Sequence, residues 1–188
     1  MAYFVYIEDE KIIGNGFMKM LTDGVQNIEV EEEIYNDIEK YIYQDGEIIL
    51  NPNYEAEQAA KEKARIQELK MTKSDFFDGT IDAWGVNEDA LLPLIQSMLA
   101  PLPLDEKQKL KAINNFKNAQ NFYRKHDLFK MIVGAPIQLT ENIQVVIEEE
   151  HLDKFFDEVD KGNKATAWQY LPQPVQIPLS EEAVEVEE

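Results

Sequence analysis

The pattern of apolar and polar side chains divides the chain into a strand-rich front and a helix-rich back. Ala2–Ile7 is a run of Tyr, Phe, Val and Ile, the residue types that favour strands. Lys11–Ile13 predicts a second extended segment, which the Gly-Asn-Gly sequence at 14–16 is expected to end. Asn27–Val30 predicts a short strand that leads into an acidic helix over 31–41.

The clearest local signal is a hairpin over residues 41–50. Two apolar runs flank Asp45-Gly46, and both of these residue types tolerate the positive φ angles of a tight hairpin turn. Together with the preceding strands and helix, the hairpin predicts a small α+β module over residues 1–53.

A charged, alanine-rich helix is predicted next, beginning at Asn53 or Tyr54 and ending at Met71, because Pro52 presets the backbone angle at its start. Its apolar positions are mostly alanine, so the helix can bury little area. We interpret residues 54–71 either as a solvated spacer or as a close contact with identical copies of the helix. The spacer is favoured because no heptad pattern persists for three turns.

Residues 72–170 predict a mainly helical domain with a short β-hairpin. Thr72 and Asn87 are suited to cap helices, because their side-chain oxygens accept hydrogen bonds from free backbone N–H groups. The short connections between the helices favour a compact bundle. The helices are expected at 73–84, 88–99, 105–125, 127–133 and 148–159, and the hairpin at 137–147.

Residues 171–188 predict an extended or disordered acidic tail. Pro172, Pro174 and Pro178 are expected to prevent regular structure, and the acidic end has little to bury. The fold class is therefore expected to be α+β: an N-terminal α+β module, a connecting helix, a helical bundle with a hairpin, and a Pro-rich acidic arm.

Composition excludes several classes of function. The net charge of −19 argues against nucleic-acid partners, whose phosphates are bound by Lys and Arg, and against anionic membrane surfaces. No apolar run approaches the roughly 20 residues of a membrane span, and no signal peptide is visible. The absence of cysteine excludes disulfides, thiolate nucleophiles and cysteine metal sites.

The charge is distributed unevenly along the chain. Residues 1–53 carry three basic and twelve acidic side chains, and residues 136–188 carry three and thirteen. Residues 105–135 carry seven basic and three acidic side chains, so they form a basic segment in an acidic chain. We expect this segment to pack against its acidic neighbours.

No catalytic, cofactor or metal site is predicted. His126 is expected at the end of a long helix, where a partly positive ring complements the dipole, and His151 within an acidic helix. The sequence around Asp157 and Asp160 lacks the ligand spacing of a calcium loop. Glu31–Glu33 are interpreted as a solvated helix start, and the aromatic residues at 116, 122, 123 and 129 as core.

Three segments carry a family resemblance. YFVYIEDEKIIGNG and the Tyr-rich hairpin YIYQDGEIILNP precede a charged helix that ends in Leu69-Lys70-Met71-Thr72-Lys73, and INNFKNAQNFYRKHDLF follows later. In this order they resemble small proteins encoded near the tail-fibre and tail-end genes of phages and prophages. The resemblance covers residues 1–130 and transfers no catalytic residue. It implies a role in the tail or in fibre assembly.

The leading hypothesis is a non-enzymatic structural or adaptor protein of a phage-like particle, associated with the tail or fibre and located in the virion after assembly in a host cytoplasm. Its partners would be other tail or virion proteins, and a homo-oligomer is possible. The alternative is an assembly chaperone that holds a fibre or tail subunit and is absent from the mature particle. An enzyme with a site built from scattered carboxylates is a third, weaker hypothesis.

Overall fold

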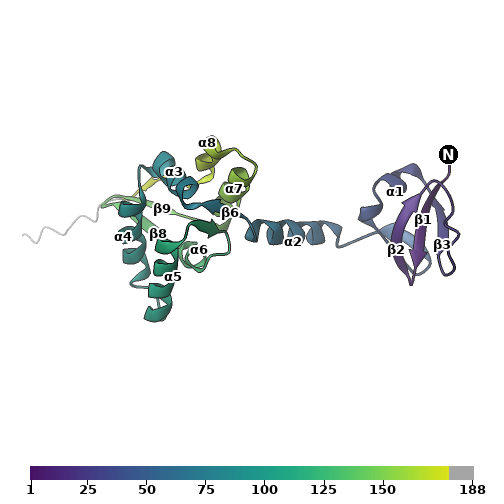
Figure 1. The fold of residues 1–188 in the computed structure, drawn as a ribbon, viewed down its shortest axis with the longest axis horizontal. Helices are drawn as coiled ribbons and strands as arrows, with labels where there is room; N and C mark the ends of the chain where they lie inside the picture. The colour runs from purple at the N-terminus through teal and green to yellow at the C-terminus, as the bar shows by residue number, and fades with distance from the viewer. Residues whose placement is uncertain (178–188) are drawn as a thin grey trace, which may run out of the picture. The chain divides into compact units, whose positions relative to one another are not determined.

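The computed structural model describes residues 1–177 and divides into two compact units. Unit 1 comprises Met1–Glu62 and unit 2 begins at Lys63. Helices account for 47% of the chain and antiparallel strands for 25%, so the expected mixed α+β class is confirmed. Figure 1 shows the order of the elements along the chain.

Unit 1 is built on a three-stranded antiparallel sheet of order β2-β1-β3. The central strand β1 is covered on both faces, because the four consecutive side chains Phe4, Val5, Tyr6 and Ile7 are all buried. The elements are β1 (Tyr3–Glu8), β2 (Lys11–Gly16), β3 (Gln26–Val30), α1 (Glu32–Asn36), the 3₁₀ turn η1 (Ile38–Lys40), β4 (Tyr41–Gln44) and β5 (Glu47–Leu50).

Two expectations for unit 1 are corrected. The Gly-Asn-Gly sequence at 14–16 does not end a strand, since it belongs to β2 and pairs with β1. The helix expected over 31–41 covers only Glu32–Asn36, because Tyr41 belongs to strand β4 and pairs with Leu50. The hairpin over 41–50 is confirmed.

The turn of that hairpin has the expected geometry. Asp45 and Gly46 have φ angles of 54° and 90°, in the left-handed region that a tight hairpin turn requires. The strands on either side pair in register from Gln44↔Glu47 outward. This turn is one of the places where local sequence alone determines the structure.

Helix α2 (Tyr54–Gln67) ends four residues earlier than expected. Lys70–Thr72 instead forms strand β6, which pairs with β7 (Asn121–Tyr123) and places Met71 in the core. The four alanines of α2 are exposed, at positions 56, 59, 60 and 64, so the alanine stripe buries little, as its composition predicted.

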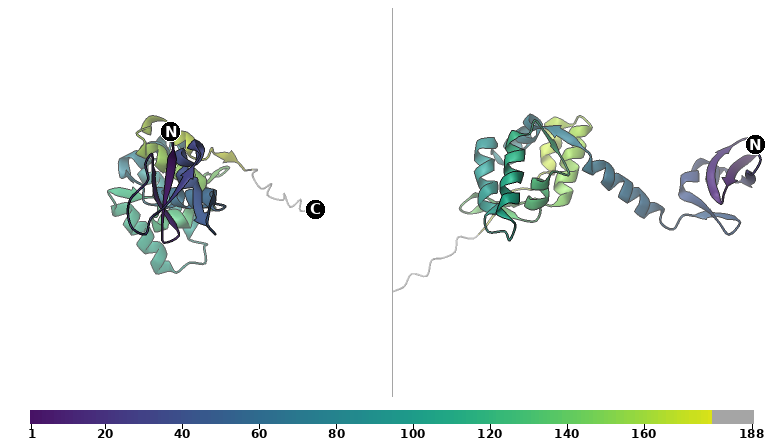
Figure 2. Two further views of the ribbon diagram at one scale, coloured as in Figure 1. Left: turned by 90° about the vertical axis from the view of Figure 1, so that its right-hand side faces the viewer. Right: turned by 60° about the horizontal axis from the view of Figure 1, so that its bottom comes forward.

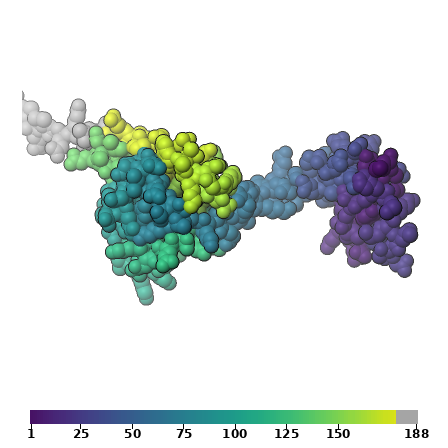
Figure 3. All heavy atoms as spheres, turned by 45° about the horizontal axis from the view of Figure 1, so that its top comes forward, coloured from purple at the N-terminus to yellow at the C-terminus, as the bar shows by residue number. Residues whose placement is uncertain are grey.

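Unit 2 contains six helices and two sheets among its described residues. Helices α4 and α5 lie side by side (Figure 2). Helix α8 packs against both α7 and α3. Figure 3 shows the yellow C-terminal residues of this unit beside its teal residues. The elements after β6 are α3 (Lys73–Trp84), α4 (Glu88–Leu99), α5 (Glu106–Asn118), β7, α6 (Asp127–Ile132), β8 (Pro136–Thr140), β9 (Ile143–Val146), α7 (Glu149–Asp160), α8 (Lys164–Ala167), the 3₁₀ turn η2 (Trp168–Tyr170) and β10 (Val175–Gln176).

Local capping fixes where several of these helices begin. The Thr72 hydroxyl accepts the N–H of Asp75, and the Asn87 side chain accepts the N–H of Ala90. Both caps were expected from the sequence. The predicted hairpin over 137–147 is also confirmed as the antiparallel pair β8–β9.

An aromatic cluster fills the core of unit 2. The rings of Phe116 and Phe122 stack with centroids 4.2 Å apart, and the edge of Phe76 meets both of them. Phe129 completes the cluster, which confirms that these rings are core. Tyr123 was assigned to the core with them, but alternation along strand β7 turns it outward, and it is 44% exposed.

The helix expected over 105–125 is shorter. Helix α5 ends at Asn118 because Ala119 is already extended and residues 121–123 form the strand that pairs with β6. The helical spacing of the apolar residues continues past Asn118 to Tyr123, but pairing with residues 70–72 makes 121–123 a strand.

The prolines after Leu171 do not prevent regular structure. Leu171 is buried, and the Trp84 indole donates a 2.8 Å hydrogen bond to the carbonyl of Pro172. Strand β10 then pairs with β9. A proline cannot donate a hydrogen bond to a sheet, but Val175 and Gln176 lie between the prolines and keep their N–H groups. Residues 178–188, part of the expected acidic tail, lie outside the described residues.

Candidate protein-binding loop and groove

Several strongly exposed apolar side chains of unit 1 lie in one loop. Residues 17–21, Phe-Met-Lys-Met-Leu, directly follow β2 in the connection between β2 and β3. Phe17 is 52% exposed, Met18 78% and Leu21 98%. Large contiguous apolar surfaces on soluble proteins mark interaction sites more often than chance exposure does. We call residues 17–21 the apolar loop.

Strand β2 positions the start of this loop through its glycines. The ring of Tyr6 lies over Gly14 and Gly16, and a Cβ at Gly16 would overlap the phenol oxygen. Because Gly16 leaves this space, the Tyr6 hydroxyl reaches the carbonyl of Met18 and donates a 2.6 Å hydrogen bond to it. The middle residue, Asn15, donates a 2.6 Å hydrogen bond to the carbonyl of Tyr35 and ties β2 to the end of α1. The Gly-Asn-Gly sequence therefore holds the loop.

Strand β3 positions the other end of the loop. The Asn27 side-chain oxygen accepts the N–H of Met20 at 2.7 Å, and its amide nitrogen donates to the Met20 carbonyl at 3.0 Å. One amide thus satisfies both backbone groups of Met20, as a neighbouring strand would. The side chains of residues 18 and 21 are left free to point outward.

Aromatic contacts fix the base of the loop. The Phe17 ring lies 4.9 Å from Tyr35 and 5.7 Å from Tyr3, measured between centroids. Lys19, the single charged residue of the loop, extends over the ring of Phe4 with its amine 5.7 Å from the centroid. The loop therefore presents methionine and leucine at its tip. These side chains suit adaptable protein contacts, because methionine is unbranched and polarizable.

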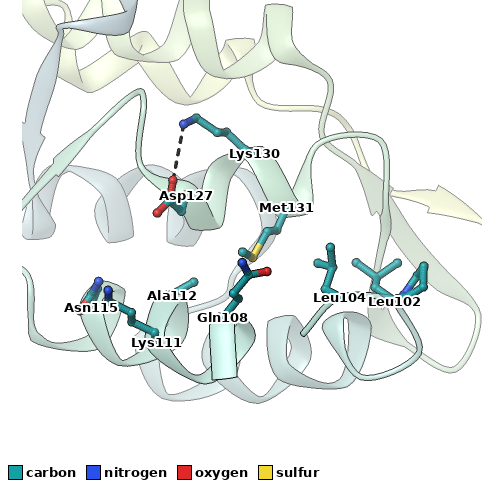
Figure 4. A pocket seen from close by; sticks show the side chains of 10 residues that line it. Leu102, Leu104, Gln108, Lys111, Ala112, Asn115, Asp127, Lys130 and Met131 are labelled. Atoms are coloured by element: carbon teal, nitrogen blue, oxygen red, sulfur yellow. Dashed lines mark hydrogen bonds and ion pairs between the residues drawn. The ribbon is translucent and has the colours of Figure 1, made fainter. Parts of the chain in front are cut away.

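A groove in unit 2 is the second candidate site (Figure 4). Its volume is about 600 Å³, within the range of sites that bind small molecules or peptide side chains. Apolar residues form its floor and polar side chains its rim. The floor includes Leu102, Leu104, Ala112 and Met131, and the rim includes Gln108, Lys111, Asn115, Asp127 and Lys130. We call this the α5–α6 groove.

A buried lysine shapes one wall of the groove. The amine of Lys109 donates to the carbonyl of Ala100, at the end of α4, and to the carboxylate of Glu106, at 3.0 and 2.7 Å. It satisfies a carbonyl that the helix end leaves free and ties the 100–104 segment to α5. Because Lys109 is occupied in this way, the charge available on the rim comes from Lys111 and Lys130.

The two histidines have structural roles. The expectation that His126 lies at the end of a long helix is wrong. Its Nδ1 accepts the N–H of Leu128 and caps the start of α6. Burial lowers the pKa of His126, and nearby Lys130 adds to this while Asp127 opposes it. His151 caps α7, where its Nδ1 accepts the N–H of Glu148.

The acidic residues singled out from the sequence do not converge on a site. Glu31–Glu33 lie exposed at the start of α1. Asp157 is paired with Arg65 and Lys161, and Asp160 lies 3.8 Å from Arg65. Across residues 1–177, no group of three or more histidines and carboxylates is arranged to hold a metal ion.

The expectation that basic residues of 105–135 pair with acidic neighbours is confirmed for two of them. Arg124, only 2% exposed, donates from Nε to Asp153 at 2.6 Å and from its guanidinium to the carbonyl of Glu149 at 3.2 Å. Lys125 pairs with Glu68 at 2.5 Å. Arg124 was not singled out from the sequence. The one available signal was the presence of an arginine in a segment whose other basic residues are lysines, because a planar guanidinium suits buried ion pairs.

The apolar loop was also missed. Its signal was a cluster of large apolar residues between two strands, where a turn would normally be polar. The cluster fits neither the two-residue period of a strand nor the 3.6-residue period of a helix.

Comparisons with known proteins add no assignment: no family model, no curated protein and no solved structure matches the chain. Within residues 1–177, the helices are all too short or too polar to cross a bilayer.

Proposed function

We propose that this protein is a non-enzymatic adaptor that binds another protein through the apolar loop of unit 1. The observation that carries the proposal is the preorganised loop: Met18 and Leu21 are exposed while the backbone beneath them is held by Tyr6 and Asn27. Preorganisation lowers the entropy lost on binding, so it favours contact with a partner. Without such a role, an exposed apolar loop would only promote aggregation, and the hydrogen bonds that fix its backbone would serve no purpose.

The size of the core of unit 1 supports the same proposal. Among residues 1–62, all of which the structure describes, the buried apolar side chains are the four of strand β1. A module of this size buries a smaller fraction of its surface than a larger domain does. Covering the apolar loop with a partner would add apolar burial to this small core.

Charge indicates what the partner surface should look like. Residues 1–53 carry twelve acidic and three basic side chains, so a partner with an apolar hollow and a basic rim would be complementary. A second copy would bring another acidic surface to the same place, and like charges would oppose that contact. The proposed occupant is therefore a different protein.

The setting we propose is the tail or fibre region of a phage-like particle, in line with the resemblance of residues 1–130. Mass spectrometry of washed particles tests this directly. We expect the protein in intact particles, and we expect Met18→Ser combined with Leu21→Ser to remove it without unfolding it. Absence of the wild-type protein from washed particles, together with its presence in the lysate, would instead support the assembly chaperone.

A further inference from the structure

We propose that the α5–α6 groove binds the chain's own acidic segment, residues 179–188. This contact is independent of the apolar loop and of the adaptor role proposed above, because it lies within the chain from Lys63 onward. Three features support the proposal: the chemistry of the groove, the sequence of the segment and the length of chain that joins them.

The groove offers an apolar floor beneath a polar rim that carries two lysines and one aspartate. Leu102 and Met131 are half-buried and Leu104 is 37% exposed, so apolar surface is available to a ligand. The amines of Lys111 and Lys130 lie at the rim, on the two helices that border the groove (Figure 4). Lys130 has one partner on its own helix, Asp127 at 3.5 Å with both side chains exposed, and such a pair contributes little.

The segment has the complementary chemistry. Residues 179–188 read Leu-Ser-Glu-Glu-Ala-Val-Glu-Val-Glu-Glu, with five glutamates and no basic residue. Val184 and Val186 each have a glutamate as a neighbour, so a valine on the groove floor places a carboxylate near the rim. The rim lysines belong to residues 105–135, the one part of the chain with a net positive charge. Opposite charges on the two surfaces favour this pairing and fix its register.

The chain is long enough for this contact. It is anchored as far as Ile177, whose N–H donates a 2.9 Å hydrogen bond to the carbonyl of Asn142. The sheet that contains β10 packs on α4 through β8, and α4 leads directly into the segment that lines the groove. The distance to be covered is set by the twelve residues of α4, which span about 18 Å. Eight residues after Ile177 can reach at most about 26 Å, which is longer than this distance.

A paramagnetic label tests this contact in the full-length protein. The chain has no cysteine, so Ser180→Cys gives a single attachment site for a nitroxide. We expect the label to broaden the amide signals of Lys111, Asn115 and Met131, and we expect dilution to leave the broadening unchanged. Lys111→Glu with Lys130→Glu should abolish it, whereas Lys117→Glu, an exposed lysine on the same helix but outside the groove lining, should not.

A second variant keeps the test independent of any effect on folding. Replacing the five glutamates of residues 181–188 by glutamine leaves every described residue unchanged, and it should also remove the broadening. Unbroadened groove signals in the labelled wild-type chain would overturn the proposal. A mixing experiment would also overturn it. One copy carries the isotope label and no nitroxide, and the other carries the nitroxide and no isotope label. Broadening in the isotope-labelled copy would show that the segment binds a second molecule.

Discussion

The side-chain amide of Asn27 binds both backbone groups of Met20, with hydrogen bonds of 2.7 and 3.0 Å. Asn27 lies in strand β3, so the sheet itself holds the apolar loop. The exposure of Met18 and Leu21 is therefore a property of the folded unit and does not require a partner to order the backbone.

Replacing Asn27 by alanine should release Met20 and lower the free energy of unfolding by about 1 kcal/mol, since both hydrogen bonds lie near the surface. Faster hydrogen exchange of the Met20 amide would be the direct readout. Asn27→Asp is the matched control, because a carboxylate still accepts from the N–H of Met20 and loses only the donor. Equal exchange rates in wild type and Asn27→Ala would contradict the role assigned to this amide.

Gly16 should tolerate no side chain, whereas Gly14 should. A Cβ at Gly16 would overlap the Tyr6 hydroxyl, while a Cβ at Gly14 would meet the Tyr6 ring at an ordinary 3.8 Å. We expect Gly16→Ala to move Tyr6 away from Met18 and to cost about 1–2 kcal/mol of unfolding free energy. Chemical denaturation of Gly16→Ala beside Gly14→Ala measures the difference. Similar stabilities would show that the contact of Tyr6 with Gly16 does not matter.

Local signals in the sequence predicted the elements whose structure depends on neighbouring residues. The Asp45-Gly46 turn and the caps at Thr72 and Asn87 need only a few adjacent residues, and all three are present. The errors lie where distant segments meet. Residues 70–72 continue a helical pattern, but their pairing with residues 121–123 makes both segments strands. No local pattern carries that pairing.

The candidate loop was not predictable for a related reason. Gly14-Asn15-Gly16 was interpreted as a break because glycine usually ends a strand, yet here Gly16 makes space for the phenol oxygen of Tyr6 on the neighbouring strand. Asn27 likewise has no local signature for binding a residue seven positions earlier. Such contacts follow from sheet register, which the sequence specifies only through the complete fold.

Arg124 should be the most sensitive charged residue of unit 2. Its guanidinium is 2% exposed and bound to Asp153 and to the carbonyl of Glu149. Arg124→Ala leaves these groups without their donor and should cost about 3 kcal/mol of unfolding free energy. Lys130→Ala, which breaks the exposed pair with Asp127, should cost less than about 1 kcal/mol. Thermal denaturation of the two variants would contradict this ranking if their losses were equal.

His126 should make the stability of unit 2 depend on pH. Burial lowers the pKa of its ring in the folded state, so the unfolded chain binds a proton more readily. The stability that the neutral ring contributes is therefore complete above about pH 6.5 and is lost as the pH falls through the folded pKa. Protonation also removes the Nδ1 acceptor that caps Leu128.

The measurement for this effect compares wild type with His126→Asn, which keeps a capping oxygen and cannot titrate. Between pH 7.5 and pH 5.5, wild type should lose more unfolding free energy than the variant. His151 and the carboxylates are present in both proteins, so their contributions cancel in the difference. Parallel curves over this range would show that His126 is not responsible.

Site-specific photocrosslinking tests the central claim, that the apolar loop is a protein-binding surface. A benzophenone amino acid at Leu21 is compared with the same group at Leu110, a leucine of α5 that is 66% exposed. In cells that produce the phage-like particle proposed above, and in particles purified from them, we expect Leu21 to crosslink to one defined protein that Leu110 does not capture. The crosslink should disappear when Met18 is replaced by serine. No discrete crosslink from Leu21, or the same products from Leu110, would contradict the claim.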